Sequence, residues 1–422
     1  MFSFPTKQVP EIMTRFFGGF RECFTPGTQE RMQEYFVSLF LPHKRFSIQA
    51  VAGSKEPDAQ YQRLQYAFSD TDWNPAQLDD MRLNYIMRSP ATAPTTGGIL
   101  AIDDTSACKA RSTKHTEGAK VQYCGSEGRL ANCNVFVYSG YADSNKHFLI
   151  DSEPYIPKEQ CDKLESPVKF RSKIELCKDL IDKAIAKGIP FSYICFDNWY
   201  LCRTLVEYIQ RRKRHFISEL AVDDRVSIGG RWMRADGLVK AIPPTKAVTV
   251  SDASNKSRSF LISARITKVR GLPGKYQIIL AQEIEPSTKK QIGKLFILIT
   301  EHLCANAEFI LHSYLLRWGI ERCFEECKDF CYLDHYQVRR ISRIRRHLSL
   351  AVLAHTFLYS ARKLGSFSKS IGNILGIPAK AVKRELRTFG DLLRAIRALI
   401  VQKNQKTLAN DATLPAAIFL GL

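Results

Sequence analysis

Two short apolar segments of the sequence run directly into acidic residues, and this arrangement can support metal-dependent chemistry. Residues 99–102 lead into Asp103 and Asp104, and residues 191–196 lead into Asp197. A carboxylate at the end of a buried strand is costly unless it is paired or shares a cation, and Mg²⁺ prefers such oxygen ligands. The pattern therefore predicts a divalent-metal site, with capping of the turn after each strand as the alternative.

A further acidic residue lies on a predicted long helix, residues 309–330. Within it, one helix face carries a hydroxyl, two cations and a carboxylate, because about 100° of rotation per residue brings together Tyr314, Arg317, Glu321 and Lys328. Such a face can hold a metal ion beside a phosphate. The alternative is a surface salt bridge between Arg317 and Glu321, which are four residues apart.

The elements that must position these residues follow from hydrophobic periodicity and from Gly and Pro breakers. Short strands alternate with two amphipathic helices around Asp103, Asp104 and Asp197, which predicts an α/β fold with a mixed sheet. The predicted order along the chain is helical (1–95), α/β (96–220), β and turn (221–307), long helices (308–365) and a basic helical tail (366–422).

The charge of the chain points to a polyanionic partner. Lys and Arg number 62 against 42 Asp and Glu, a formal net charge of +20, and phosphate groups are neutralised by such side chains. The first 98 residues contain as many acidic as basic side chains, so the excess lies after them. Residues 338–347 contain five arginines and no acid, Arg339, Arg340, Arg343, Arg345 and Arg346. We expect this segment to follow a DNA backbone, with an exposed helix face as the alternative.

The remaining composition excludes several classes of protein. No stretch of 18 apolar residues exists, so no membrane span is predicted. The twelve cysteines include no Cys-x-x-Cys pair and no zinc spacing. Cys323, Cys327 and Cys331 recur every four residues and are expected to be reduced packing residues. Without a secretory signal, the expected location is the cytoplasm, in association with the nucleoid.

The helix pattern Tyr-x2-Arg-x3-Glu-x6-Lys of residues 314–328 resembles the motif of bacterial insertion-sequence DDE transposases. Residues 102–105 (Ile-Asp-Asp-Thr) and 196–200 (Phe-Asp-Asn-Trp-Tyr) resemble the first and second acidic motifs of that family, and residues 123–133 and 61–73 resemble further segments of it. The resemblance implies a ribonuclease-H-like core formed by residues 96–220 and 308–365. It also implies three further parts: a helical N-terminal DNA-binding domain (1–95), an inserted β subdomain (221–307) and a helical C-terminal region (366–422).

The resemblance implies that Asp104, Asp197 and Glu321 are the catalytic metal ligands for two Mg²⁺ ions, which Mn²⁺ can replace. Asp103 competes with Asp104, because strand alternation sends neighbouring side chains to opposite sides and only one can face the metals. The position before Thr105 favours Asp104. Glu325 and Glu326 follow Glu321 closely but do not have the spacing of the motif.

The same resemblance implies residues that contact DNA. Tyr314, Arg317 and Lys328 are expected to hold phosphates beside the scissile bond, Arg317 by a fork-shaped contact and Lys328 as a point charge. Trp232, between Arg231 and Arg234 in the insertion, is the candidate for stacking on a flipped base of a transposon-end hairpin. A tryptophan of the hydrophobic core is the equal alternative.

The implied activity is a DNA transposase that cleaves transposon ends by two-metal-ion chemistry and transfers the strands into target DNA, in a cut-and-paste manner. Its partners would be double-stranded DNA of the ends and the target, with a homodimer holding two ends together. One alternative is a ribonuclease-H-fold nuclease or resolvase that cuts without joining. The other is a domesticated DNA-binding regulator with an inert core.

Overall fold

The computed structural model describes residues 9–43, 46–53, 59–113, 115–125 and 127–409. The N-terminal part is helical, as the periodicity predicts. Its helices are α1 (Glu11–Gly18), α2 (Pro26–Ser38), α3 (Ile48–Ala52), α4 (Ala59–Ser69) and α5 (Pro75–Met87). The side chain of Asn74 caps α5 by accepting from the Ala76 N–H at 2.9 Å, and Pro75 occupies its first position. This helix was not expected from the sequence, because it has almost no amphipathic periodicity.

The centre of the molecule is one mixed sheet of ten strands in the path β2-β3-β1-β5-β6-β12-β11-β10-β9, with β4 also paired to β3. The β1–β5 and β5–β6 pairs are parallel, and the other pairs, including β1–β3 and β6–β12, are antiparallel. This confirms the predicted mixed α/β class. The strands are β1 (Ile99–Cys108), β2 (Lys120–Cys124), β3 (Arg129–Ala142), β4 (His147–Tyr155), β5 (Tyr193–Phe196), β6 (His215–Glu219), β9 (Lys246–Ser251), β10 (Ser257–Thr267), β11 (Tyr276–Ile284) and β12 (Gln291–Thr300).

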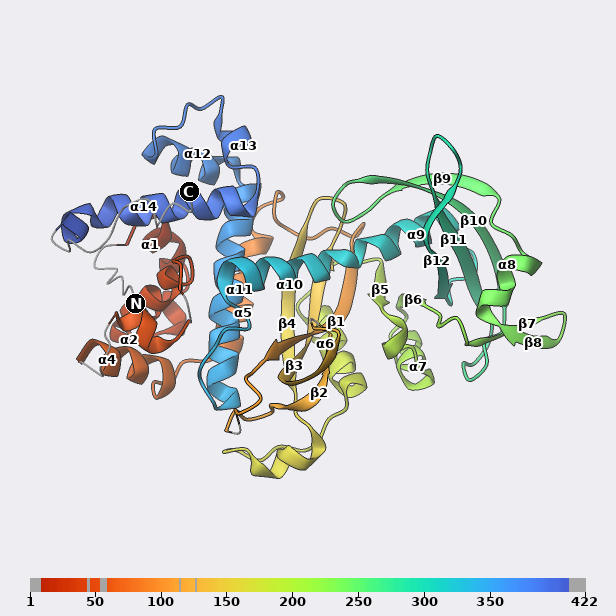
Figure 1. Ribbon diagram of the computed structural model, residues 1–422, viewed down its shortest axis with the longest axis horizontal. Helices are drawn as coiled ribbons and strands as arrows, with labels where there is room; N and C mark the ends of the chain where they lie inside the picture. Colours follow the sequence, from red (N-terminus) through yellow and green to blue (C-terminus); the bar gives the residue numbers. More distant parts are fainter. Residues whose placement is uncertain (1–8, 44–45, 54–58, 114, 126, 410–422) are drawn as a thin grey trace.

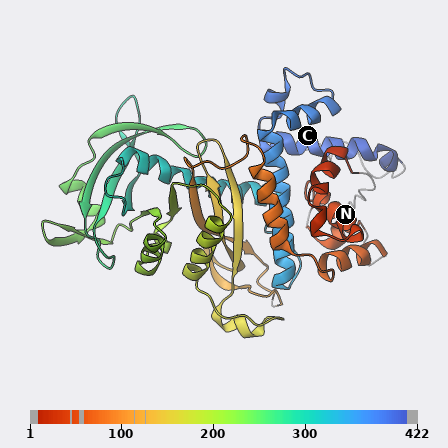
Figure 2. The ribbon, with the colours of Figure 1, turned by 180° about the vertical axis from the view of Figure 1, so that it is seen from behind.

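Helices cover both faces of the sheet around β1 and β5. Helices α9 (Ala307–Leu316) and α10 (Trp318–Cys331) cross one face (Figure 1), and α6 (Lys173–Ala186) and α7 (Arg203–Arg211) lie on the other (Figure 2). The single helix expected over residues 309–330 is two helices that meet at Arg317, whose backbone remains helical at φ −53° and ψ −36°. The face that carries Arg317 and Glu321 is therefore kept.

The segment 221–307 is built of strands, but most of it does not form a separate sheet. Strand β12 pairs with β6, with Leu298 opposite Glu219 and Ile299 opposite Ser218. Through this pairing β9 to β12 extend the core sheet, because the backbone groups of a strand edge gain partners when another strand adds to it. Only β7 (Arg225–Ile228) and β8 (Arg231–Arg234) form a sheet of their own, a two-stranded hairpin.

The C-terminal helices return to the N-terminal ones. Helix α11 (Ile341–Lys363) packs along α5, and α12 (Gly365–Ile374), α13 (Val382–Glu385) and α14 (Phe389–Ala409) follow. The α14 residue Arg397 donates to the Phe40 carbonyl at 2.8 Å, and Figure 1 places α14 beside α1 at one end of the molecule. Within the described residues, no helix is long and apolar enough to cross a membrane.

A buried cluster of two histidines and a carboxylate ties α10 to the sheet and to α11. Glu326 Oε2 lies 2.9 Å from Nε2 of His355 and 3.2 Å from Nε2 of His147. Burial raises the pKa of Glu326, but the hydrogen bonds from both histidines outweigh burial and hold that pKa well below its usual value of 4.5. A carboxyl whose pKa is lowered by folding stabilises the protein above its unfolded-state pKa and loses that contribution as the pH falls.

We therefore expect Glu326→Gln to lower the free energy of unfolding by about 2 kcal/mol at pH 7. The difference from the unsubstituted protein should shrink as the pH is lowered below 4.5, where the carboxylate of the unfolded chain is protonated. Urea unfolding of both proteins at a series of pH values measures this. A difference that stays constant over the whole range would show that Glu326 acts by packing alone.

Candidate active site

The parallel pairing of β1 and β5 brings the acidic residues of the two strands together. Ile99 lies opposite Tyr193 and Ala101 opposite Cys195. When this register is continued by two residues along both strands, Asp103 lies alongside Asp197. Asp103 and Asp104 lie in the middle of β1, not at its end as expected, because the strand continues to Cys108 in its pairing with β3. The acids thus lie beside the carboxyl end of β5.

Strand alternation separates Asp103 from Asp104. Asp103 faces α10, where its Oδ2 accepts from Nη1 of Arg317 at 2.9 Å. The other terminal nitrogen of Arg317 lies 2.8 Å from Oε1 of Glu321, so this guanidinium, only 9% exposed, bridges the two carboxylates. Burial raises the pKa of Asp103 to about 7, with Arg317 opposing the rise and the neighbouring Asp197 and Asp104 adding to it.

Asp104 faces α6 on the opposite side of the sheet. Its Oδ2 accepts from Nζ of Lys173, the first residue of α6, at 2.9 Å and from the hydroxyl of Tyr200 at 3.1 Å. The Ser172 hydroxyl and Glu175 form a capping box that fixes the start of α6, and this cap places Lys173. The Lys173 ammonium also lies 5.0 Å from the ring centre of Trp199, which is exposed.

Asp197 follows β5 and begins a short turn, as the capping alternative predicts, but it also belongs to the acidic cluster. Its Oδ1 accepts from the Trp199 N–H at 3.1 Å. Burial raises the pKa of Asp197, Asp104 raises it further by repulsion, and Arg317 lowers it. Asp103, Asp197 and Glu321 therefore act on Arg317 electrostatically, and Asp104, on the other side of the sheet, repels Asp103 and Asp197.

The chemistry of this cluster fits a divalent cation. The donors are carboxylate oxygens, which Mg²⁺ prefers, and Arg317 and Lys173 relieve part of their mutual repulsion. The Arg317 Nε is buried without a hydrogen-bond partner. The oxygens of Asp104, Asp197 and Glu321 are not all within 4.8 Å of one another, because Asp104 faces α6 and Glu321 is held by Arg317.

Two of the residues expected to hold phosphates lie below the surface. The Tyr314 hydroxyl donates to Oε2 of Glu219 at 3.3 Å, and this side chain is buried. Arg317 uses both terminal nitrogens on carboxylates, as described above. Lys328, two turns beyond Glu321 on α10, is partly exposed. In this conformation Tyr314 and Arg317 hold carboxylates in place within the protein. Among Tyr314, Arg317 and Lys328, the partly exposed position of Lys328 is the one suited to contact a ligand.

Most of the arginine segment does not present unpaired charge, because acids distant in the sequence lie against three of its five arginines. Arg340 pairs with Glu165, Arg343 lies 3.1 Å from Asp70, and Arg345 lies 3.8 Å from Glu153. Arg346 donates to three carbonyl oxygens, those of Phe68 (2.8 Å), Thr71 (2.7 Å) and Trp73 (3.0 Å). The side chain of Arg339 is exposed and has no ion pair to a described residue.

These contacts predict different phenotypes for two neighbouring arginines. Arg346→Ala should lower the free energy of unfolding by about 2–3 kcal/mol, because three carbonyl groups lose a charged donor. Arg339→Ala should leave stability unchanged and reduce by about one the slope of log K against log salt for DNA binding. Urea unfolding and DNA binding at several salt concentrations measure both. An unchanged salt slope for Arg339→Ala would remove this residue from the DNA contacts.

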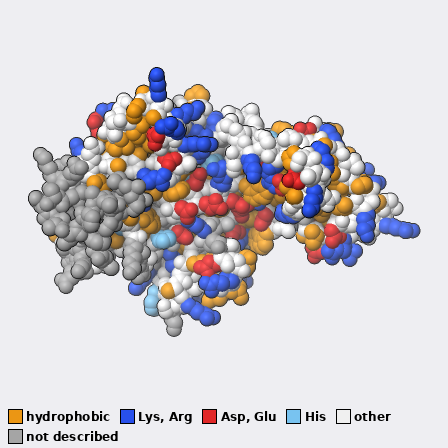
Figure 3. Space-filling view, turned by 45° about the horizontal axis from the view of Figure 1, so that its top comes forward, with side chains coloured by type: hydrophobic (Ala, Val, Ile, Leu, Met, Phe, Trp, Pro, Cys, Tyr) orange, Lys and Arg blue, Asp and Glu red, His pale blue; other side chains and the backbone are white. Residues whose placement is uncertain are grey.

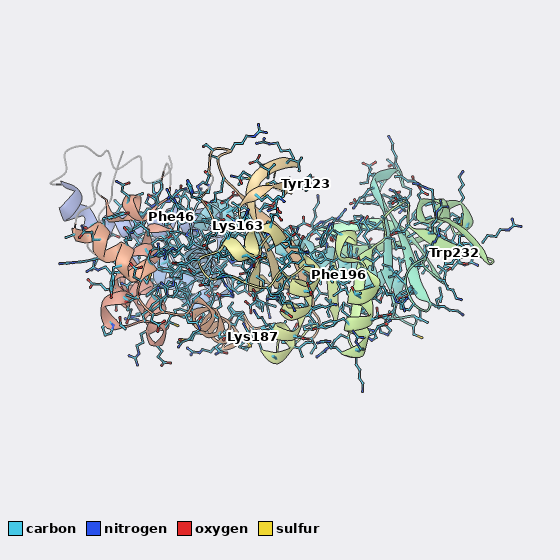
Figure 4. The ribbon with its side chains drawn as sticks, turned by 90° about the horizontal axis from the view of Figure 1, so that it is seen from below. Phe46, Tyr123, Lys163, Lys187, Phe196 and Trp232 are labelled. Atoms are coloured by element: carbon cyan, nitrogen blue, oxygen red, sulfur yellow. The ribbon has the colours of Figure 1, made fainter. Side chains whose placement is uncertain are left out.

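Trp232 lies far from the acidic cluster, on the β7–β8 hairpin. Figure 4 shows it at one end of the molecule, well separated from Phe196, which precedes Asp197. Its side chain is 49% exposed, so the alternative of a core tryptophan is wrong. Arg231 and Arg234 flank it on the same strand, and Arg234 pairs with Asp236 at 2.9 Å. An exposed indole between arginines remains suited to stacking on a base.

Three residues near the cluster could not be identified from the sequence as parts of a site. Trp199 and Tyr200 were visible as the aromatic end of the segment Phe-Asp-Asn-Trp-Tyr, but their partners were not. Nothing in the sequence around Lys173 indicated a role in the site, since a lysine in the first turn of an amphipathic helix is common.

Figure 3 shows Asp and Glu side chains gathered in the middle of one face, with Lys and Arg side chains around them.

Comparisons with known proteins agree with this geometry. The family model described as "DDE superfamily endonuclease" matches residues 19–236, and the one described as "Transposase DDE domain" matches residues 171–357. No functionally curated protein matches the chain. Among solved structures, the NurA nuclease from Sulfolobus solfataricus is 11% identical, with 68% of this chain and 85% of that chain covered, but its TM-score of 0.25 adds nothing to the argument. Because the first model spans more than half of the sequence, the chain belongs to the DDE superfamily of endonucleases and transposases.

Proposed function

We propose that the protein is a DNA transposase that cleaves transposon ends and transfers them into target DNA in a cut-and-paste reaction. Membership of the DDE superfamily implies a nuclease-type enzyme that acts on DNA. The observation that carries the proposal is the group of three carboxylates around Arg317, those of Asp103, Asp197 and Glu321, with Asp104 beside them on the same strand as Asp103; all lie within the matched regions. The net charge of +20 supports a polyanionic substrate.

Asp104, Asp197 and Glu321 would hold the divalent cations of this reaction, two Mg²⁺ ions or Mn²⁺ in their place. The chemistry that bound ions supply is activation of the attacking water or DNA 3′-hydroxyl and stabilisation of the leaving 3′-oxygen. Lys173 and Tyr200 orient Asp104 by their hydrogen bonds to its Oδ2. Both are weaker partners than a cation and can be displaced from that oxygen.

Asp103 has a positioning role in this proposal. It anchors the buried Arg317, and Arg317 in turn holds Glu321 at 2.8 Å. A buried guanidinium keeps its charge at every accessible pH, so it keeps the carboxylates close together before a cation binds. Asp103 then sets the direction of the Glu321 side chain without contacting the substrate.

Trp232 is proposed to stack on an unpaired base of the transposon end. Truncating a stacking aromatic costs roughly 1–3 kcal/mol per base, so Trp232→Ala should slow resolution of a hairpin end at least about tenfold. Cleavage of a linear end should change less, because Trp232 is remote from the acidic cluster. Single-turnover assays on hairpin and linear ends measure both rates, and equal rates for the variant and the unsubstituted protein would exclude stacking.

The function is tested with purified protein, its flanking genomic DNA and Mg²⁺, by mapping the cleavage position on each strand. A second reaction supplies pre-cut ends and a target plasmid, which a transposase converts to joined product. Cleavage without joining would instead identify a nuclease or resolvase. End binding without cleavage, unaffected by Asp197→Asn, would identify a regulator. If two ends must be held together, sedimentation with end DNA should reveal a dimer.

A further inference from the structure

Three cysteines from different strands meet on one face of the sheet, at the end of β1 beyond Asp104. Cys108 ends β1, Cys124 ends β2, and Cys133 lies in β3 directly opposite Cys108. In the β2–β3 pairing Cys133 lies opposite Lys120, which is four residues from Cys124. An even spacing places side chains on the same side of a strand, so all three thiols share one face. The neighbouring Tyr123, labelled in Figure 4, is exposed, as alternation requires.

A carboxylate completes this group. The sulfur atoms of Cys108 and Cys124 are 2.8 Å apart, and each lies within 4.8 Å of a carboxylate oxygen of Glu127. Glu127 lies in the β2–β3 turn, where its N–H donates to the Cys124 carbonyl at 3.1 Å and Gly128 follows with φ +62°. Glycine adopts that conformation without strain, so the tight turn returns Glu127 toward the two thiols. Among the described residues, this is the tightest cluster of potential metal ligands.

The chemistry of the three ligands is specific. Thiolates select soft or borderline cations, and Zn²⁺ binds two to four cysteines together with nitrogen or carboxylate ligands in tetrahedral sites. A disulfide would join Cys108 and Cys124 at about 2.05 Å, whereas two thiolates bound to one tetrahedral Zn²⁺ at about 2.3 Å each lie roughly 3.8 Å apart. From their separation of 2.8 Å the two sulfurs therefore have to move apart when the ion binds.

We propose that Cys108, Cys124 and Glu127 bind one Zn²⁺ in an open site, with water in the fourth position on the exposed side of Glu127. The ion would clamp the β2–β3 turn to the end of β1. Lys109, the next residue, donates to the carbonyls of Asp334 (3.1 Å) and Tyr336 (3.0 Å), just beyond α10. The site thereby stabilises the wall of a cleft of about 700 Å³ that Cys108 and Lys109 line together with Tyr336 and Arg339.

The test is the zinc content of the full-length protein, purified without metal-affinity resin or chelator and measured by inductively coupled plasma mass spectrometry. We expect one zinc per chain, and loss of it in Cys108→Ser, Cys124→Ser and Glu127→Gln. The control is Cys304→Ser, because Cys304 is exposed and outside the cluster, and it should keep the metal. Cys124 is fully buried and its variant can misfold, so Cys108→Ser and Glu127→Gln, at more accessible positions, decide the outcome.

A second readout identifies the ligands. Protein stripped with chelator and titrated with Co²⁺ should show a thiolate-to-cobalt charge-transfer band that falls by about half in Cys108→Ser, because one of two thiolates is lost. A zinc-free protein without this band would overturn the proposal. So would a Cys108–Cys124 disulfide found by mass spectrometry of unreduced peptides, or zinc that is retained in the cysteine variants and lost in Asp197→Asn.

Discussion

Asp104→Asn is expected to reduce DNA cleavage by at least about a thousandfold, equivalent to roughly 4 kcal/mol of transition-state stabilisation. The substitution replaces a charged oxygen ligand by a neutral amide of the same shape, so cation binding is lost while packing is kept. The hydrogen bonds that Lys173 and Tyr200 donate to Oδ2 can be made to an amide oxygen. Single-turnover cleavage of end DNA with Mg²⁺, together with Mn²⁺ binding by electron paramagnetic resonance, measures the effect.

Asp103→Asn is the matched control on the other side of the same strand. It should lower cleavage by only about ten- to a hundredfold, because Arg317 loses its anchor and Glu321 becomes less ordered, while the cation ligands stay. Mn²⁺ binding should persist. The opposite pattern, with cleavage and Mn²⁺ binding lost in Asp103→Asn and kept in Asp104→Asn, would assign the ligand to Asp103, which lies on the side of Glu321.

The second large effect is expected at Glu321 on α10. Glu321→Gln should also reduce cleavage by at least about a thousandfold, because the side chain loses its charge while it can still accept from Arg317. Its side chain is 43% exposed and ends beside the other acids, so the variant should fold normally. Cleavage of end DNA and thermal unfolding should be measured on the same preparations, and the unfolding midpoint should stay within about 2 °C of the unsubstituted protein.

Glu325→Gln is the control for this variant. Glu325 lies one turn further along α10, is exposed, and has no ion pair to a described residue. It should keep cleavage within about twofold, since it lacks contact with the cluster. Both variants should bind end DNA as tightly as the unsubstituted protein. Equal activity of Glu321→Gln and Glu325→Gln would remove Glu321 from the catalytic residues.

Much of the fold was accessible from local pattern. The apolar runs predicted β5 and the start of β1, and the sequence predicted helices in the α/β segment and within residues 308–365, where α6 and α11 lie. Helix α5 was missed because the charged residue Arg82 lies on its packed side, where it donates to the Leu149 and Ile150 carbonyls at 2.8 Å. A polar residue on the buried face weakens the amphipathic period.

The partners of charged residues were much less accessible. Five arginines without a neighbouring acid predict unpaired charge, yet Arg343 meets Asp70 and Arg340 meets Glu165. These acids lie more than 170 residues away along the chain, and nothing in the local composition marks them. The extension of the core sheet by β12 was hidden for the same reason, since strand pairing across the chain depends on register and not on local propensity.

The sequence by itself determined which residue types are available for chemistry, and it placed Arg317 and Glu321 on one helix face, because helical periodicity is a property of neighbouring residues. It also required Asp103 and Asp104 to face opposite sides of their strand. Only the tertiary structure decided which aspartate faces α10, and only it brought Cys108, Cys124 and Glu127 within reach of one ion. Both outcomes depend on how β1, β3 and the helices pack, and that packing is a sum of long-range contacts that no short segment contains.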